Sequence, residues 1–228
     1  MIINILTLFP EAFGSVFDSS IVARAQGQGK VKINIVNMRD FAKDNYNSVD
    51  DHPFGGGPGM ILRVDIVDTA LNSLKKAGRK VLLTPQGKQF TQGKAGEFSK
   101  LKALTLVCGH YEGFDQRVHN HLVDEEISVG PYVLTGGEIP AMVVVDSVAR
   151  LLPGVINEES LKNESFSKSQ ELEASSYLEY PQYTKPREYK GWEVPEILLS
   201  GNHKAIEEWR QSSAPKVPSS SSISKPST

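Results

Sequence analysis

The sequence has 228 residues, of which 39% are hydrophobic and 23% charged, as in an ordinary globular protein of one or two domains. A formal net charge of −2 does not by itself indicate nucleic-acid binding, and the single cysteine, Cys108, excludes an internal disulfide framework and a Cys-based zinc cluster. No signal peptide and no run of the ~18 apolar residues needed to span a membrane is found, so we expect a cytoplasmic protein without membrane contact.

Short apolar runs alternate with longer mixed segments along residues 1–156. Strands are predicted where Val, Ile and Leu concentrate, at 2–8, 31–36, 81–84, 103–108 and 127–129. Helices are predicted between and after them, at 10–26, 64–77, 91–101, 114–122 and 140–152. This order predicts an α/β fold with a mostly parallel sheet. Residues 141–145 are apolar on every side, which predicts that the last helix is buried.

The composition changes after residue 156. Residues 157–173 are polar and predict a flexible linker between domains. Residues 174–212 are rich in aromatic residues and proline and predict a second, small helical domain, whose last helix, at 202–210, Gly201 or Asn202 could cap. Residues 213–228 are rich in Ser and Pro and predict a disordered tail.

Cations concentrate in residues 71–102, which contain eight Lys and Arg residues and one acid, Glu97. Such a run is more often a solvated surface than a binding site. An RNA-binding interpretation therefore needs a second, independent signal.

Three glycine-containing loops follow the last three predicted strands, at 84–87, 109–113 and 130–137. Parallel sheets bind ligands beyond the carboxyl ends of their strands, and glycine permits either φ > 0 or a close approach to a ligand. None of the loops has the glycine spacing of a dinucleotide site or the Lys of a phosphate-binding loop, and 127–149 contains no Lys or Arg. Each loop alone could be a simple turn. Together they favour an adenine nucleoside without phosphates, such as S-adenosylmethionine.

Several segments closely resemble the bacterial tRNA (guanine-N1-)-methyltransferase family of the SPOUT superfamily. They are GGGPGM (55–60), LTPQG (83–87), CGHYEGFDQRV (108–118), SVGPYVLTGGEIPAM (128–142) and LLSGNHKAIEEWR (198–210). The resemblance extends from Met1 to about Arg210. It implies a deep trefoil knot that binds S-adenosylmethionine within domain 1–156, a tRNA-binding domain at 174–212 that is shorter than usual, and an obligate homodimer.

The resemblance also implies which residues line the cofactor pocket. They are Leu83, Pro85, Gly109, Tyr111, Glu112, Gly113, Val129, Gly130, Pro131, Tyr132, Val133, Leu134, Gly136 and Gly137. Glu112 would lie near the positive end of the cofactor, although a solvent-exposed acid in a turn is an equally simple interpretation. Glycines 109 and 136 are expected to need φ > 0 or a close approach.

Two residues are implied in the chemistry. Arg150 would stabilise negative charge on guanine O6, although an ion pair with Asp146, one helical turn earlier, is the simpler interpretation of its position. Glu179 would act as the general base, at a position where many relatives carry Asp; a surface acid in a proline-rich turn is the alternative.

The loop at 44–59 is expected to face the RNA, with Asp50 and Asp51 hydrogen-bonding to guanine edges or simply solvated. The linker would order as a lid when cofactor and tRNA bind. The resemblance further implies a need for magnesium without pointing to its ligands. Pro131, His110, Gln182 and Lys185 depart from the residues common in the family.

The sequence leaves two other functions open. The chain could be a non-catalytic RNA-binding member of the same fold, which would be expected to lack the cofactor loops or the catalytic pair. It could also be a metabolic enzyme for a phosphorylated nucleotide, which would be expected to carry cations at the loops.

Overall fold

The computed structural model describes residues 1–162, 164–166 and 178–215. The chain divides into two compact units, Met1–Asn157 and a second beginning at Glu158, and each is described by itself. Parts of the predicted linker 157–173 and of the predicted tail 213–228 lie outside the described residues. The domain boundaries and the disorder of the tail therefore stay predictions.

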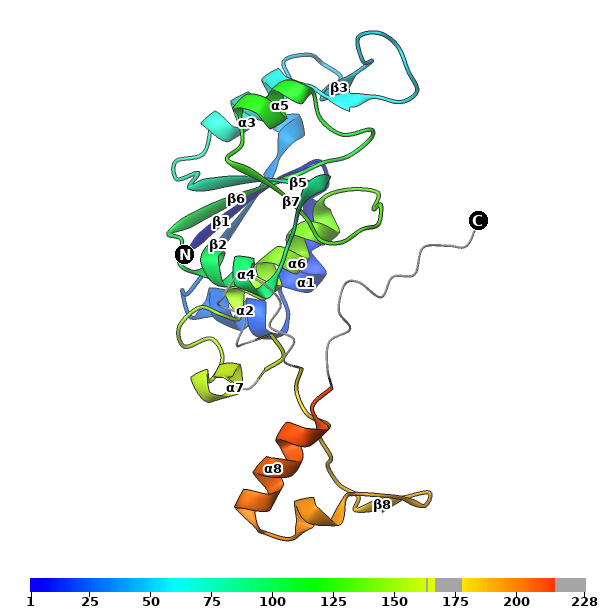
Figure 1. Cartoon of the computed structure of the whole chain (residues 1–228). Helices are drawn as coiled ribbons and strands as arrows, with labels where there is room; N and C mark the ends of the chain where they lie inside the picture. Colours follow the sequence, from blue (N-terminus) through cyan, green and yellow to red (C-terminus); the bar gives the residue numbers. More distant parts are fainter. Residues whose placement is uncertain (163, 167–177, 216–228) are drawn as a thin grey trace, which may run out of the picture. The chain divides into compact units, whose positions relative to one another are not determined.

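A five-stranded sheet in the order β2-β1-β6-β5-β7 forms the centre of the first unit (Figure 1). Every neighbouring pair of its strands is parallel, which confirms the predicted mostly parallel α/β architecture. The strands are β1 (Ile2–Thr7), β2 (Lys32–Asn37), β5 (Arg79–Gln89), β6 (Ala103–Cys108) and β7 (Glu125–Ser128). A separate antiparallel pair, β3 (Asp50–Asp51) and β4 (Ile61–Leu62), flanks the loop between them.

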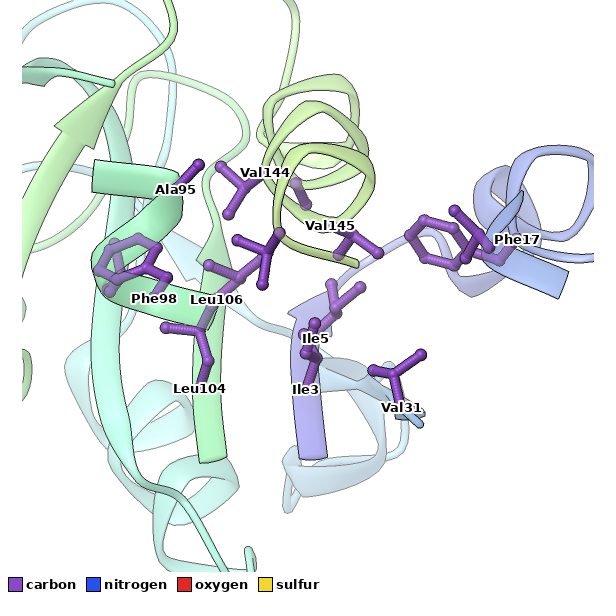
Figure 2. Close-up of a cluster of buried hydrophobic side chains, with 14 of the residues drawn as sticks. Ile3, Ile5, Phe17, Val31, Ala95, Phe98, Leu104, Leu106, Val144 and Val145 are labelled. Carbon is purple, nitrogen blue, oxygen red and sulfur yellow. The ribbon is translucent and has the colours of Figure 1, made fainter. Parts of the chain in front are cut away.

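Helices cover both faces of this sheet, because alternate side chains of its inner strands point to opposite sides. Ile3 and Ile5 of β1 enter one buried cluster, whereas Leu6 enters the other. Figure 2 shows the first cluster, where α4 and α6 pack over β1 and β6. That face carries η1 (Pro10–Phe13), α1 (Gly14–Phe17), α2 (Ser20–Gly27), α4 (Gln92–Ser99) and α6 (Glu138–Ala149). The opposite face carries η2 (Met38–Phe41), α3 (Val64–Asn72) and α5 (Gln116–His121).

Two helix predictions are corrected. The single helix expected at 10–26 is three short pieces. The main break lies between α1 and α2, because Ser19 is extended and Ser20, the first residue of α2, has a φ of 50°, so the chain cannot continue helically from one into the other. Helix α6 is buried on one face only, since Ile139 and Val143 are 55% and 41% exposed. Its uniform hydrophobicity therefore reflects a packed inner face together with an apolar outer one.

The described part of the second unit is built from short elements. It contains α7 (Glu158–Lys162), a hairpin of β8 (Glu188–Tyr189) and β9 (Trp192–Glu193), η3 (Glu196–Leu199) and α8 (His203–Ser213). Asn202 caps α8 as predicted, because its side chain accepts a hydrogen bond from the Ala205 amide at 3.2 Å. No described residue of this unit is buried. None of the helices in the described residues of either unit combines the length and the apolar character needed to cross a membrane.

Candidate functional site

The three glycine loops predicted from the sequence meet at one end of the sheet. They do so because β6, β5 and β7, which precede or contain them, are adjacent strands. The 84–87 segment was expected to follow a strand, but it lies within β5. Leu83 and Lys88 both pair with Ile127 of β7, so residues 84–87 leave the ladder and then rejoin it. This interruption of the ladder lies at the end of the sheet where the other two loops meet.

The loops enclose a cavity of about 360 Å³, within the usual range for small-molecule sites. All the residues predicted to line a cofactor pocket contribute to it except Pro131, which is exposed on its loop. The sequence interpretation missed lining residues that flank the glycine motifs: Thr84, Gln86, His110, Phe114, Gln116, His119, Ile127, Ser128, Thr135 and Pro140. Their proximity to those motifs in the chain is the one signal that could have found them.

The described lining of this cavity contains no Lys or Arg. A cation does reach its edge, because the Arg39 guanidinium donates to the Tyr111 hydroxyl at 3.4 Å. His119, which is in the lining, has its Nδ1 3.0 Å from a Glu126 carboxylate oxygen. A cavity without cations in its lining is poorly suited to phosphates, as the sequence had indicated.

The loop 109–113 has a strained but well-anchored backbone. Tyr111 has a φ of 57° and Gly113 a φ of 110°. The Glu112 amide donates to the Met60 carbonyl at 3.0 Å, and the Leu62 amide donates to the Gly113 carbonyl at 2.9 Å. A non-glycine residue in the left-handed region persists only where its surroundings impose it, and such residues concentrate at binding sites.

The third loop packs tightly against the end of β6. The Gly137 amide donates to the Gly109 carbonyl at 2.8 Å, and a Cβ on Gly137 would lie 2.5 Å from the Cα of Cys108. A Cβ on Gly136 would lie 2.3 Å from a Glu138 carboxylate oxygen. Neither Gly109 nor Gly136 has φ > 0, so of the two expected alternatives close approach is the one that applies to them. Close packing of the protein on itself therefore requires glycine most clearly at 137, where the neighbour is backbone, whereas the nearest atoms at 109 and 136 belong to the Phe114 and Glu138 side chains.

Glu138 is a buried acid in the first turn of α6, beside these glycines. The Thr7 hydroxyl donates to its carboxylate at 2.7 Å, and the same hydroxyl accepts from the Phe9 amide at 2.9 Å. Burial, with the Glu138 charge as a second cause, raises the pKa of the Cys108 thiol well above its usual range. Cys108 is thus an unreactive core residue, as its sequence context indicated.

Arg150 and Glu179 do not line the cavity. Arg150 is the half-buried C-cap residue of α6 in the first unit. Glu179 belongs to the second unit, where its amide donates to the Ser165 hydroxyl at 3.0 Å and its carboxylate accepts from the Gln182 side-chain amide. Their predicted catalytic roles therefore stay predictions.

Asp50 and Asp51 form β3, and Asp51 lines a second cavity of about 500 Å³ between the 51–55 loop and the start of α5. The cations there are paired: Arg63 with Asp65 at 2.8 Å, and Arg117 with Asp115 at 2.7 Å. The loop between β3 and β4 approaches the first cavity at Gly59. This glycine has a φ of 77°, and a Cβ at this position would lie 2.4 Å from the side chain of Glu112, which lines the cavity.

Part of the basic run at 71–102 has a structural role. Lys94 contacts Glu97 at 2.7 Å and Glu125 at 3.0 Å, and Arg79 contacts Glu125 at 3.0 Å. These ion pairs join β5, α4 and β7. For Arg79 and Lys94, these ion pairs supply a structural explanation that does not require RNA binding.

Comparison with known proteins identifies the family. The profile of the family described as "tRNA (Guanine-1)-methyltransferase TrmD" matches residues 1–219. The chain belongs to this family. It is 53% identical over 211 residues to the tRNA (guanine-N(1)-)-methyltransferase of Metamycoplasma arthritidis, covering 92% of this chain and 89% of the relative. The corresponding enzymes of Syntrophomonas wolfei and Staphylococcus aureus are 53% and 50% identical over 213 residues, covering 92% of this chain and 84% of each relative.

Membership of the tRNA (guanine-1)-methyltransferase family confirms the resemblance drawn from the glycine motifs and makes the chain a methyltransferase. Within the described residues, no three His, Cys, Asp or Glu side chains gather in a way that could hold a metal ion. Magnesium, which the resemblance implied, therefore has no assigned ligands.

Proposed function

We propose that the protein transfers a methyl group from S-adenosylmethionine to N1 of the guanosine immediately 3′ of the anticodon in tRNA. The observation that carries this proposal is the cavity formed by the loops at 84–87, 109–113 and 130–137, whose described lining holds no Lys or Arg, in a chain of this family. We also propose a trefoil knot at this end of the sheet. The close packing of Gly137 against Cys108 is consistent with it.

The cavity fits S-adenosylmethionine in size and chemistry. Backbone amides and carbonyls of the three loops can read the adenine edge, and Leu83, Val129 and Leu134 offer apolar surface to the ring. Glu112 supplies the one carboxylate of the described lining, which suits a positively charged ligand. When bound, S-adenosylmethionine supplies a methyl group activated by its sulfonium.

Methylation at N1 requires removal of a weakly acidic proton from guanine. We assign this proton transfer to Glu179, whose carboxylate would accept it from N1. A carboxylate with an ordinary pKa of about 4.3 is a weak base for this task. We therefore assign to Arg150 the stabilisation of charge that develops on guanine O6 as N1 loses its proton, a contribution of roughly 3 kcal/mol.

We further propose that the protein acts as a homodimer, in the cytoplasm, with the linker as a lid over the bound ligands. The apolar outer face of α6, with Ile139 and Val143 exposed, supports an association surface. Asp50 and Asp51 are proposed to contact the guanine edges. Their position on β3 supports this role, because the adjoining loop packs on Glu112 of the cofactor cavity through Gly59.

The decisive experiment is methyl transfer from labelled S-adenosylmethionine to an unmodified tRNA with guanosine 3′ of the anticodon. The matched control is the same tRNA with adenosine at that position. We expect transfer to the first and none to the second. Calorimetry with S-adenosylhomocysteine and ATP tests the cavity separately, and a preference for ATP would favour the nucleotide-enzyme alternative. Cofactor binding without any transfer would favour the non-catalytic alternative.

A further inference from the structure

The hairpin of β8 and β9 in the second unit carries two aromatic rings on one face. Tyr189 stands opposite Trp192, and their ring centroids are 5.9 Å apart. The turn between them, Lys190 and Gly191, has φ values of 53° and 80°, as a two-residue type I′ turn requires. The Val194 amide donates to the Arg187 carbonyl at 2.9 Å and extends the pairing by one step. This turn and pairing hold the two rings in a defined arrangement.

The two faces of the hairpin differ in chemistry. Glu188 stands opposite Glu193, and because successive side chains of a strand alternate, both acids lie on the face away from the rings. Lys190, in contrast, lies on the aromatic face, with its Nζ 5.3 Å from the centre of the Tyr189 ring. One face therefore presents flat rings with a cation, and the other presents two negative charges.

The aromatic face is open within the described unit. Every residue from 181 to 193 is exposed, and Trp192 and Tyr189 are 70% and 54% exposed. In Figure 1 the hairpin projects from the second unit, away from α8. Tyr183 provides a contrast, because its ring packs against Trp209 of α8 at 6.3 Å. The unit thus uses one aromatic pair for its own packing and leaves the other pair free of such a contact among the described residues.

We propose that the aromatic face of the hairpin, formed by Tyr189, Lys190 and Trp192, binds unpaired bases of the tRNA. The inference rests on the proposed function, which makes tRNA the substrate. A base would stack on the Trp192 indole or the Tyr189 ring, and Lys190 would contact a neighbouring phosphate. Duplex bases have no free face, so a loop or other unpaired segment is the part of tRNA that fits.

The charges favour RNA over a second copy of the chain as the occupant. Burial of Lys190 in an apolar protein interface would remove its charge from water without a described partner, whereas phosphates attract it. The two acids on the opposite face would repel phosphates and so direct RNA to the aromatic face. Proteins that bind single-stranded nucleic acids combine aromatic rings, on which bases stack, with cations that contact the phosphates.

The first experiment uses the two tryptophans of the chain separately. In full-length Trp209→Phe, Trp192 is the remaining indole, and we expect unmodified tRNA to quench its fluorescence. In the matched variant Trp192→Phe, the remaining Trp209 should change little. An unaltered Trp192 signal at saturating tRNA would overturn the proposal. A Trp192 signal that changes on dilution of the protein without RNA would also overturn it, because a second copy would then cover the face.

The second experiment measures tRNA affinity by filter binding. Trp192→Ala should weaken binding roughly five- to hundred-fold, and Trp192→Phe, which retains a stacking ring, should weaken it less. Lys190→Gln should reduce the slope of log affinity against log salt by about one. Glu193→Gln, on the opposite face, is the control and should not weaken binding.

These outcomes separate the two proposals. If the wild-type protein neither binds nor methylates tRNA, the proposed function fails and this inference fails with it. If the wild type methylates tRNA and Trp192→Ala binds it equally well, only the role of the hairpin is overturned. Affinity for S-adenosylhomocysteine should be the same in all hairpin variants, which reports that the first unit is intact.

Discussion

The cavity of the first unit and the hairpin of the second unit are opposite kinds of binding surface. The cavity is built from backbone held in place by buried neighbours, as where Gly137 lies against Cys108. The hairpin consists of exposed side chains on a unit in which no described residue is buried. A ligand thus meets a cavity with buried walls in the first unit, whereas in the second it meets exposed side chains on a short hairpin.

Hydrogen exchange on the ligand-free protein tests this comparison most directly. We expect amides of β1 and β6 to exchange at least about a thousand times more slowly than those of the β8–β9 hairpin. The strands lie between two buried clusters, whereas the hairpin amides are protected only by an exposed ladder. Equal protection in the two regions would mean that the second unit is packed against a further surface.

The proposed chemistry takes one residue from each unit, so substitutions in both units test it. Arg150→Ala and Glu179→Gln should each lower kcat and kcat/KM by roughly 100-fold or more, with little change in cofactor affinity. The reason is that both side chains are proposed to act on guanine and not on the cofactor. Single-turnover kinetics measures the effect.

The double variant and a conservative control define what would contradict these assignments. If the two residues act as one unit, the double variant should be scarcely slower than the worse single one. Glu179→Asp should retain much of the rate, since the carboxylate survives. Near wild-type single-turnover rates in Glu179→Gln would place the base elsewhere.

A methyl group inserted at Gly137 should damage the preformed cavity. Gly137→Ala places a Cβ 2.5 Å from the Cα of Cys108, so the backbone must shift, and we expect a loss of about 1–3 kcal/mol in the free energy of unfolding, with weaker cofactor binding. Urea unfolding and calorimetry measure the two effects.

Gly96→Ala is the matched control for that substitution. Gly96 lies within α4, and a Cβ at this position would meet no neighbouring atom within 4 Å, so alanine there should stabilise the protein by roughly 0.5–1 kcal/mol. Equal stability of the two variants would show that the space around Gly137 adapts.

A similarly small effect is expected at Asp115, which caps α5 at the edge of the first unit. Hydrogen bonds from the Arg117 side chain, and secondarily its amide, lower the Asp115 pKa to about 2, against the opposing effect of burial. A lowered pKa stabilises the fold above the ordinary value of 3.8, and that contribution disappears as the pH falls from about 4 to about 2.

Asp115→Asn retains the cap but removes the charge. Because Arg117 is exposed and its charge is screened, we expect a loss of only about 1 kcal/mol in the free energy of unfolding at pH 7, and near-equal stability of variant and wild type at pH 2. Urea unfolding at the two pH values measures this. A difference that persists at pH 2 would indicate that the substitution disturbs packing instead of the ion pair.

The sequence alone was sufficient for the features that depend on local pattern. Apolar runs located the five strands of the main sheet, and Asn202 indicated the start of α8. The glycine motifs indicated the family and a set of cavity residues of which every one except Pro131 lines the cavity. These predictions succeed because strand hydrophobicity, capping and tight turns are determined by neighbours in the chain.

Only the tertiary structure decided the features that depend on contacts between distant segments. The strand order placed β6, β5 and β7 side by side, so three separate loops share one cavity. The tertiary structure also shows that Glu138 and Cys108 lie against Gly136 and Gly137. Restricted space, and not a left-handed backbone, therefore explains glycine at these two positions. Close approach between segments far apart in sequence leaves no periodic trace, since a glycine looks the same whether space or φ requires it.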